Sequence, residues 1–152
     1  MKTKKDIVEN WLPRYTGRAL QDFTKYIILT NFEDYLDLFS EMYNEPIIGV
    51  DKTMPSVSHD GITIINFGMG SPNAATILDL LTAIEVEAIL FLGKCGGIKD
   101  KNSVGDYILP IAAIKGEGTS NDYFPHEVPA LPAFSLQKAC SKAITNHGRQ
   151  YY

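Results

Sequence analysis

Residues 61–93 place the strongest constraint on what this chain can fold into. Two apolar runs, "GITIINF" at 61–67 and "EAILFLG" at 87–93, flank a helix candidate that extends from Pro72 to Ile84. Continuous apolar runs are typical of strands that are covered on both faces. Strand, helix and strand in this order predict a βαβ unit whose two strands are parallel. We therefore expect a layered α/β domain with a largely parallel sheet.

The N-terminal part of the chain continues this alternation. Residues 4–12 carry apolar side chains at helical spacing, and Pro13 is expected to end that helix. "YIILT" at 26–30 predicts a strand, and the segment after it predicts an amphipathic helix with Asn31 as its cap candidate. Phe32, Tyr35, Leu36 and Phe39 would share the apolar face of that helix.

The C-terminal part is less regular. "GDYILPIAAI" at 105–114 predicts a strand in which Pro110 implies a bulge, a break or an edge position. Residues 132–145 predict a helix that ends near Asn146, with Gly148 as a stop signal. The final "YY" resembles the start of another strand, so we expect one domain, residues 1–152, that stops before its sheet is complete.

Composition narrows the choice of partners. The formal net charge is −4, which is the wrong sign for a surface that binds nucleic acid. No apolar run approaches the length needed to cross a bilayer, and no secretory leader is visible, so we expect a cytoplasmic protein without a membrane partner. Cys95, Cys140 and the three scattered histidines show no metal-ligand spacing, so no metal site is expected.

The turn "FGMGSPN" at 67–73 is the first candidate for a binding site. Its glycines follow a strand, and Pro72 suits the first turn of the following helix. Glycines let a ligand approach the backbone, and a helix N-terminus favours anions and electron-rich hydroxyl groups. Gly68, Met69 and Gly70 are therefore candidate substrate-binding residues.

Other interpretations of this turn remain open. A dinucleotide-binding fingerprint would need a third glycine where the sequence has Asn73, and the next strand does not end in an acidic residue. The GxxxxGK[ST] phosphate loop and the GxSxG nucleophile elbow are absent. A tight connection that binds no ligand also fits the pattern.

Two further segments follow predicted strands. "GKCGG" comes after the parallel strand at 87–93, which we expect to be adjacent to the strand at 61–67, so Lys94, Cys95, Gly96 and Gly97 should face the first glycine turn. "KGEGTSNDYFPHEVP" at 115–129 has the composition of a functional loop and contributes Glu117, Thr119 and Ser120 as weaker candidates. An exposed lysine and an ordinary surface connection are the alternatives.

Four motifs in order, "FGMGSPNAA", "LGKCGGI", "VGDYILPIAAI" and "GEGTSNDYFP", resemble the nucleoside phosphorylase family, and more narrowly its hydrolytic branch, the AMP nucleosidases. The resemblance implies a three-layer α/β fold with a twisted central sheet, a hexameric assembly and cleavage of the bond between a purine and ribose. It also implies that Met69 contacts the sugar and that Lys94 and its neighbours lie near the nucleophile and the base.

The sequence departs from the phosphorylases at two places. The phosphate loop that phosphorylases carry after the first strand is replaced by Thr30 and Asn31, without arginine. Phe91 stands where phosphorylases place a second arginine. Because phosphate would have little to hold it, water is the expected nucleophile.

The resemblance therefore implies hydrolysis of AMP to adenine and ribose 5-phosphate without metal or organic cofactor. The family's catalytic carboxyl groups lie in the C-terminal part of the domain, so none of Asp106, Glu117 and Asp122 matches a catalytic position. A nucleoside phosphorylase and a noncatalytic nucleotide-binding or assembly protein remain the alternatives.

Overall fold

The computed structural model describes residues 2–152. The chain divides into two compact units, residues 1–93 and residues 94–152. The expectation that residues 1–152 form a single domain stays a prediction.

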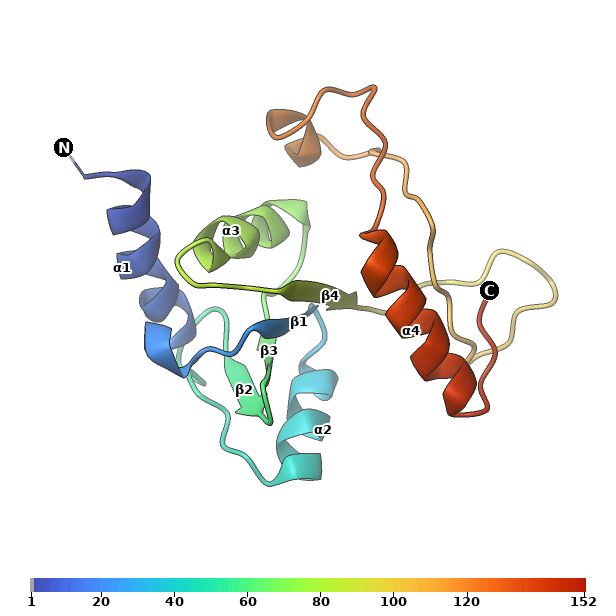
Figure 1. Ribbon diagram of the computed structural model, residues 1–152, viewed down its shortest axis with the longest axis horizontal. Coiled ribbons are helices and arrows are strands. Elements are labelled where there is room, and N and C mark those ends of the chain that lie inside the picture. The colour runs from blue at the N-terminus through green and yellow to red at the C-terminus, as the bar shows by residue number, and fades with distance from the viewer. Residues whose placement is uncertain (1) are drawn as a thin grey trace. The chain divides into compact units, whose positions relative to one another are not determined.

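Unit 1 is built on a four-stranded sheet in the order β2-β3-β1-β4 (Figure 1). The strands are β1 (Tyr26–Thr30), β2 (Ser56–His59), β3 (Ile62–Asn66) and β4 (Ala88–Leu92). β1 pairs in parallel with both β3 and β4, and only β2 runs antiparallel to its neighbour. The predicted largely parallel α/β sheet is confirmed.

The strand order corrects one expectation. The strands at 61–67 and 87–93 are both present and run in the same direction, but they are not neighbours, because β1 lies between them. Their carboxyl ends are at one edge of the sheet with the end of β1 in the middle. The connection from β3 to β4 therefore crosses over a strand formed earlier in the chain, which periodicity alone does not reveal.

β2 and β3 form a hairpin that the sequence analysis did not identify. Asp60 and Gly61 connect the two strands, and both have positive φ angles, 43° and 82°. Positive φ at two central residues is the pattern of a type I′ turn, for which Asp-Gly is a favoured pair. The Asp60-Gly61 pair was therefore the sequence signal from which this hairpin could have been predicted.

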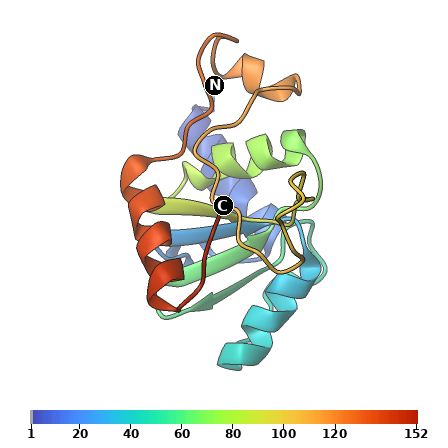
Figure 2. The same cartoon turned by 90° about the vertical axis from the view of Figure 1, so that its right-hand side faces the viewer.

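Helices cover both faces of this sheet (Figures 1 and 2). α1 (Lys4–Thr16) and α3 (Ser71–Leu81) pack on one face, and α2 (Glu33–Tyr43) packs on the other. A short 3-10 turn, η1 (Leu20–Asp22), connects α1 to β1. The three-layer arrangement agrees with the predicted fold class.

Two apolar clusters hold the layers together. The larger cluster joins buried side chains of α1, α3, β1, β3 and two connecting segments, namely Leu12, Ile27, Leu29, Ile65, Phe67, Ile77, Leu80 and Leu81, together with Met54. The smaller cluster places Leu36 of α2 against Val57 and Ile64. Tyr35 and Phe39 also pack there, which confirms most of the predicted apolar face of α2.

α1 does not end at Pro13, contrary to expectation. The helix continues to Thr16, whose buried hydroxyl donates a hydrogen bond to the carbonyl of Leu12 at 2.8 Å. Gly17 then closes the helix with φ 72° and donates its N–H to the carbonyl of Pro13. A proline inside a helix is unfavourable, and the burial of Leu12 and Thr16 on either side of it offsets that cost.

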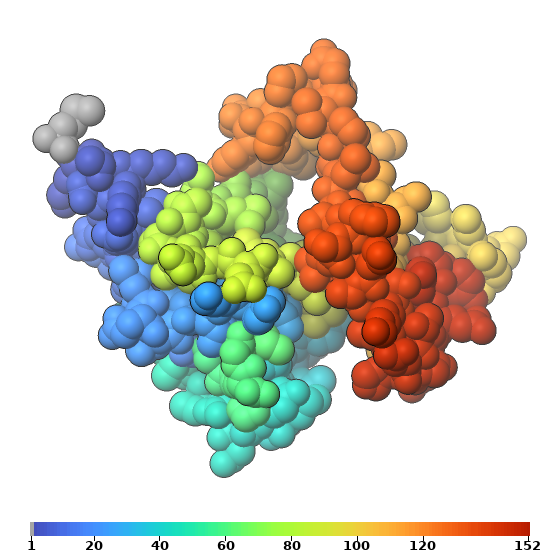
Figure 3. All heavy atoms as spheres, in the orientation of Figure 1, coloured from blue at the N-terminus to red at the C-terminus, as the bar shows by residue number. Residues whose placement is uncertain are grey.

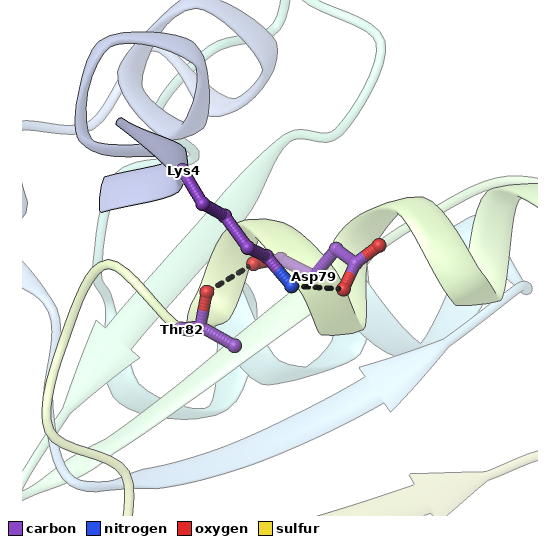
Figure 4. A network of polar contacts seen from close by, with 3 residues as sticks. All are labelled: Lys4, Asp79 and Thr82. Atoms are coloured by element: carbon purple, nitrogen blue, oxygen red, sulfur yellow. Dashed lines mark hydrogen bonds and ion pairs between the residues drawn. The ribbon is translucent and has the colours of Figure 1, made fainter. Parts of the chain in front are cut away.

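α1 and α3 also touch at their exposed surfaces. Lys4 Nζ lies 3.2 Å from Asp79 Oδ1, and the Thr82 hydroxyl donates to the Asp79 carbonyl at 2.6 Å (Figure 4). In the space-filling view the green atoms of α3 lie beside the blue atoms of the N-terminal segments (Figure 3). Such an exposed ion pair adds little stability, so apolar packing dominates this contact.

Unit 2 contains η2 (Thr119–Asp122) and α4 (Phe134–Asn146). The predicted C-terminal helix is confirmed, and Gly148 with φ 67° follows its end. No strand forms over 105–114 within the described residues, so that prediction was wrong. Instead, Tyr107 makes an isolated parallel bridge with Tyr151, and Ala113 makes an isolated antiparallel bridge with Ala130.

The failed strand has a physical explanation. Pro110 lacks the backbone N–H that hydrogen bonding to a neighbouring strand requires. The side chains of Ile111 and Ile114 are also largely uncovered, because these residues are 77% and 97% exposed. Without a covered face or a continuous partner strand, the apolar side chains cannot stabilise extended pairing. The predicted break at Pro110 is consistent with this outcome.

Candidate functional site

The glycine turn after β3 has a backbone that only glycine adopts readily. Gly68 has φ 79°, and Gly70 has φ 96° with ψ 155°. Gly70 is the N-cap residue of α3, and no side chain caps this helix. Pro72 occupies the first turn of the helix, as predicted. The turn therefore presents backbone rather than bulky side chains around the start of α3.

Two asparagines hold this turn in place. Gly68 donates its N–H to Oδ1 of Asn66 at 3.0 Å, and Asn73 Nδ2 donates to the carbonyl of Met69 at 3.1 Å. Neither asparagine was selected from the sequence. Their positions at the end of a strand and in the first helical turn, on either side of the glycines, were the available signal. The backbone of Met69 is fixed while its side chain remains 71% exposed.

The end of β1 lies beside this turn. Phe67 donates its N–H to the carbonyl of Thr30 at 3.0 Å, which continues the pairing of β1 with β3. Asn31 Nδ2 lies 3.5 Å from Met69 Sδ, so the two strand-end segments touch through side chains. The expected cap role of Asn31 was wrong, because the N-cap of α2 is Phe32 and no side chain caps it.

The end of β4 is apolar. Phe91 is 60% exposed, and its ring centroid lies 6.0 Å from that of Phe67. A Cβ atom added to Gly93 would lie only 2.8 Å from the Phe91 ring, so Gly93 makes room for this ring. An aromatic ring therefore occupies the place at which the resemblance to phosphorylases implies an arginine.

In unit 2, the second glycine segment is open. Lys94, Cys95, Gly96 and Gly97 are all exposed. A Cβ atom added to Gly97 would lie 2.9 Å from the Asn102 side chain, whereas one added to Gly96 would meet nothing within 4 Å. Close packing thus constrains Gly97 but leaves Gly96 unconstrained.

The third segment is organised around a carboxylate. Thr119 and Ser120 donate their backbone N–H groups to Glu117 at 2.8 and 3.1 Å, at the start of η2. Lys115 Nζ donates to the carbonyls of Phe124 and Pro125. The Ser120 hydroxyl is buried and has no hydrogen-bond partner. Glu117 thereby holds its own loop, and this local role was not foreseen.

A cavity of about 520 Å³ lies within unit 2, between α4 and the segment that contains Leu109 and Ile111. None of the predicted site residues lines it. Residues 2–152 also contain no group of three or more His, Cys, Asp or Glu side chains placed to hold a metal ion. The same residues contain no helix with the length and apolarity required to cross a membrane.

Comparison with known proteins places this fold in a family. Residues 25–152 match the family model described as the phosphorylase superfamily. The chain belongs to this superfamily. The match includes the glycine turn, both later candidate segments and α4, so the resemblance drawn from the four motifs is confirmed at family level.

Individual relatives include nucleosidases and phosphorylases. A crystal structure of AMP nucleosidase from Bacteroides thetaiotaomicron VPI-5482 is 63% identical, with a TM-score of 0.96 over 99% of this chain and 66% of that one. AMP nucleosidase of Escherichia coli K12 is 24% identical over 84% of this chain and 34% of its own length. Purine nucleoside phosphorylase from Toxoplasma gondii, 21% identical, shares the fold with a TM-score of 0.79 over 88% of this chain and 56% of that one.

The chain thus spans about a third of the length of the Escherichia coli relative. The predicted site residues of this chain are divided between its two units. Gly68, Met69 and Gly70 lie together in unit 1 at the carboxyl edge of the sheet, and the seven others lie in unit 2. The expectation that the two glycine segments face a common cleft stays a prediction.

Proposed function

We propose that this chain contributes to an AMP nucleosidase-like enzyme, which hydrolyses the N-glycosidic bond of AMP to adenine and ribose 5-phosphate. The observation that carries the proposal is the 63% identity to the Bacteroides AMP nucleosidase over 99% of the chain. The curated AMP nucleosidase of Escherichia coli supports the same assignment at lower identity.

The chemistry requires a site that stabilises positive charge on the ribose and protonates the departing base. We propose the turn Gly68–Gly70 as the sugar side of this site, because its glycine backbone and the uncapped start of α3 accept close approach of a ligand. Met69 provides an exposed, flexible apolar side chain at that position.

We propose unit 2 residues Lys94, Cys95, Gly96 and Gly97 as a second binding segment, with Lys94 as its cation. Glu117, Thr119 and Ser120 form a third segment, in which the buried Ser120 hydroxyl retains hydrogen-bonding capacity for a ligand after a small shift of the loop. None of these residues is proposed as the general acid.

The proposed nucleophile is water. At the ends of β1, β3 and β4 the segments 30–32, 66–70 and 91–93 contain no charged side chain. A phosphate nucleophile would need cationic or multiple N–H donors to hold its charge. Glu33 and Lys94 follow directly after two of these segments, but no arginine is present in or next to them, and we therefore assign water as the nucleophile.

One assay tests the proposal and separates it from its alternatives. The 152-residue chain is mixed with AMP, with and without inorganic phosphate, and adenine is quantified by chromatography. Adenine released at equal rates in both mixtures would support hydrolysis. Release that depends on phosphate would identify a phosphorylase instead. Nucleotide binding without adenine release would identify a noncatalytic nucleotide-binding or assembly component.

We further propose a cytoplasmic homo-oligomer, with a hexamer as the form suggested by the family resemblance. Analytical ultracentrifugation of the chain tests the assembly directly. A monomer at every concentration measured would contradict it.

A further inference from the structure

The side chain of Asn31 is the strongest unexplained feature at the strand-end edge of unit 1. Its Oδ1 atom is buried and has no hydrogen-bond partner, although the residue is half-buried rather than enclosed in the core. Its Nδ2 atom donates to the sulfur of Met69 at 3.5 Å. Buried polar atoms nearly always have a partner, so an unpaired amide oxygen at this place requires an explanation.

The partner that Asn31 does have is a weak one. A thioether sulfur is a poor hydrogen-bond acceptor, and the methionine side chain has several freely rotating bonds. The Met69 side chain is 71% exposed, whereas its backbone carbonyl is held by Asn73. The sulfur can therefore move away from Asn31 without disturbing the turn.

The surroundings of Asn31 indicate what kind of group would replace the sulfur. Asn31 follows β1, the strand between β3 and β4, and the three segments that end at this edge contain no charged side chain. An unpaired carbonyl oxygen repels anions and accepts from O–H donors. A neutral hydroxyl group can donate to Oδ1, and it accepts from Nδ2 better than a thioether does.

We propose that Asn31 is a ligand-binding residue that accepts a hydrogen bond from a hydroxyl group of a ribose-containing ligand, and that the Met69 side chain swings aside to admit it. The inference rests on the proposed function for the ribose class of its ligand and for the choice of AMP as one probe. It extends that proposal by adding a side-chain hydrogen-bond acceptor, which neither Gly68 nor Gly70 possesses.

The test follows the methyl group of Met69 by NMR in protein labelled with ¹³C-methyl methionine. The probes are AMP, ribose 5-phosphate, adenine and inorganic phosphate. In the wild-type chain the Met69 signal should shift with the two ribose compounds and stay unchanged with the other two. Met42, 62% exposed on α2, and Met54, 2% exposed in the core, are internal controls that should not respond.

Two variants separate a binding role from a structural one. Asn31→Leu removes both polar atoms and should weaken ribose 5-phosphate binding roughly tenfold while raising the melting temperature, because an unpaired buried oxygen is lost. Asn31→Gln keeps a neutral amide with both its acceptor and its donor, and it should bind ribose 5-phosphate more tightly than Asn31→Leu. Asn10→Leu, on the exposed surface of α1, is the matched control and should leave binding unchanged.

The outcomes are distinguishable. Unchanged binding by Asn31→Leu, or no response of wild-type Met69 to either ribose compound, would overturn the role of Asn31. Loss of binding in Asn31→Gln to the level of Asn31→Leu would also overturn it. A response to ribose 5-phosphate without one to AMP would support Asn31 as a sugar-binding residue and contradict the proposed AMP substrate.

Discussion

Arg18 donates from Nε to the hydroxyl of Ser56 at 2.9 Å, and from an Nη atom to the Ser56 carbonyl at 3.3 Å. The contact connects the segment after α1 with the start of β2, and both residues are buried. Burial lowers the pKa of the Arg18 guanidinium, but arginine stays charged at neutral pH. Arg18 therefore fixes the position of the antiparallel edge of the sheet.

Replacing Arg18 by alanine should lower the free energy of unfolding by about 2–4 kcal/mol, because it removes packing and leaves the buried Ser56 hydroxyl without its partner, whereas the Ser56 carbonyl still accepts from the Ile48 N–H. Urea unfolding followed by the fluorescence of Trp11, the single tryptophan, measures the effect. Arg14→Ala, at an exposed position of α1, should stay within about 0.5 kcal/mol of wild type. Equal losses in both variants would contradict the structural role of Arg18.

The two predicted glycine segments should respond differently to alanine. Gly70→Ala should destabilise the chain by about 1–3 kcal/mol, since φ 96° with ψ 155° is accessible almost only to glycine. Gly96→Ala should change stability by less than about 0.5 kcal/mol, because its Cβ would enter open space. Scanning calorimetry follows the whole chain, and a large loss for Gly96→Ala would show that its surroundings are tighter than described.

The capping box of α1 should make part of the stability depend on pH. Thr3 and Asp6 exchange backbone-to-side-chain hydrogen bonds of 2.8 and 3.2 Å, and these bonds lower the pKa of the Asp6 carboxyl. A lowered pKa means that the unfolded chain takes up the proton first as pH falls. The stabilisation is therefore complete above the ordinary aspartate pKa, about 3.9, and is lost as pH falls through the lowered value.

Asp6→Ala tests this pH dependence. The difference in melting temperature between wild type and the variant should be largest near neutral pH and should shrink as the pH falls below about 4. Asp37→Ala, at an exposed position of α2, controls for general effects of removing a carboxylate. A difference that grows on acidification would have the wrong sign for this mechanism.

Lys94 supplies a test of the second binding segment. Lys94→Ala should weaken nucleotide binding at least about fivefold if the ammonium group contacts the ligand, and should leave the melting temperature nearly unchanged because the residue is exposed. Lys99→Ala, another exposed lysine of the same unit, should bind like wild type. Isothermal titration with AMP measures both variants, and equal affinity would remove Lys94 from the proposed site.

Much of unit 1 could be predicted because local pattern and tertiary packing agree there. β1 occupies the predicted residues 26–30, and α3 begins one residue before Pro72 as the turn chemistry requires. The predicted roles of Pro13 and Asn31 were wrong because tertiary contacts outweighed the local helix-ending and helix-capping preferences of these residues. Burial of Leu12 and Thr16 continues α1 through the proline, and Asn31 contacts Met69 instead of capping α2.

The candidate site was less accessible to sequence reasoning. Periodicity identifies strands but not their lateral order, so the position of β1 between β3 and β4 was missed. The asparagines around the glycine turn act through contacts between segments that are distant in sequence, as Asn31 does with Met69. Glu117 was selected as a candidate, but its bonds to Thr119 and Ser120 depend on how the loop closes on itself.

The place of β1 has a consequence for how the chain is made. Ribosomes release this strand before either of its hydrogen-bonding neighbours, because β3 and β4 both come later in the chain. A nascent chain that has exposed only its first sixty residues therefore carries an apolar ribbon with no native strand to dock against. β1 gains its first native partner only when β3 has been made, and the sheet is complete only when β4 follows, so the pairing of this strand is non-local in the chain.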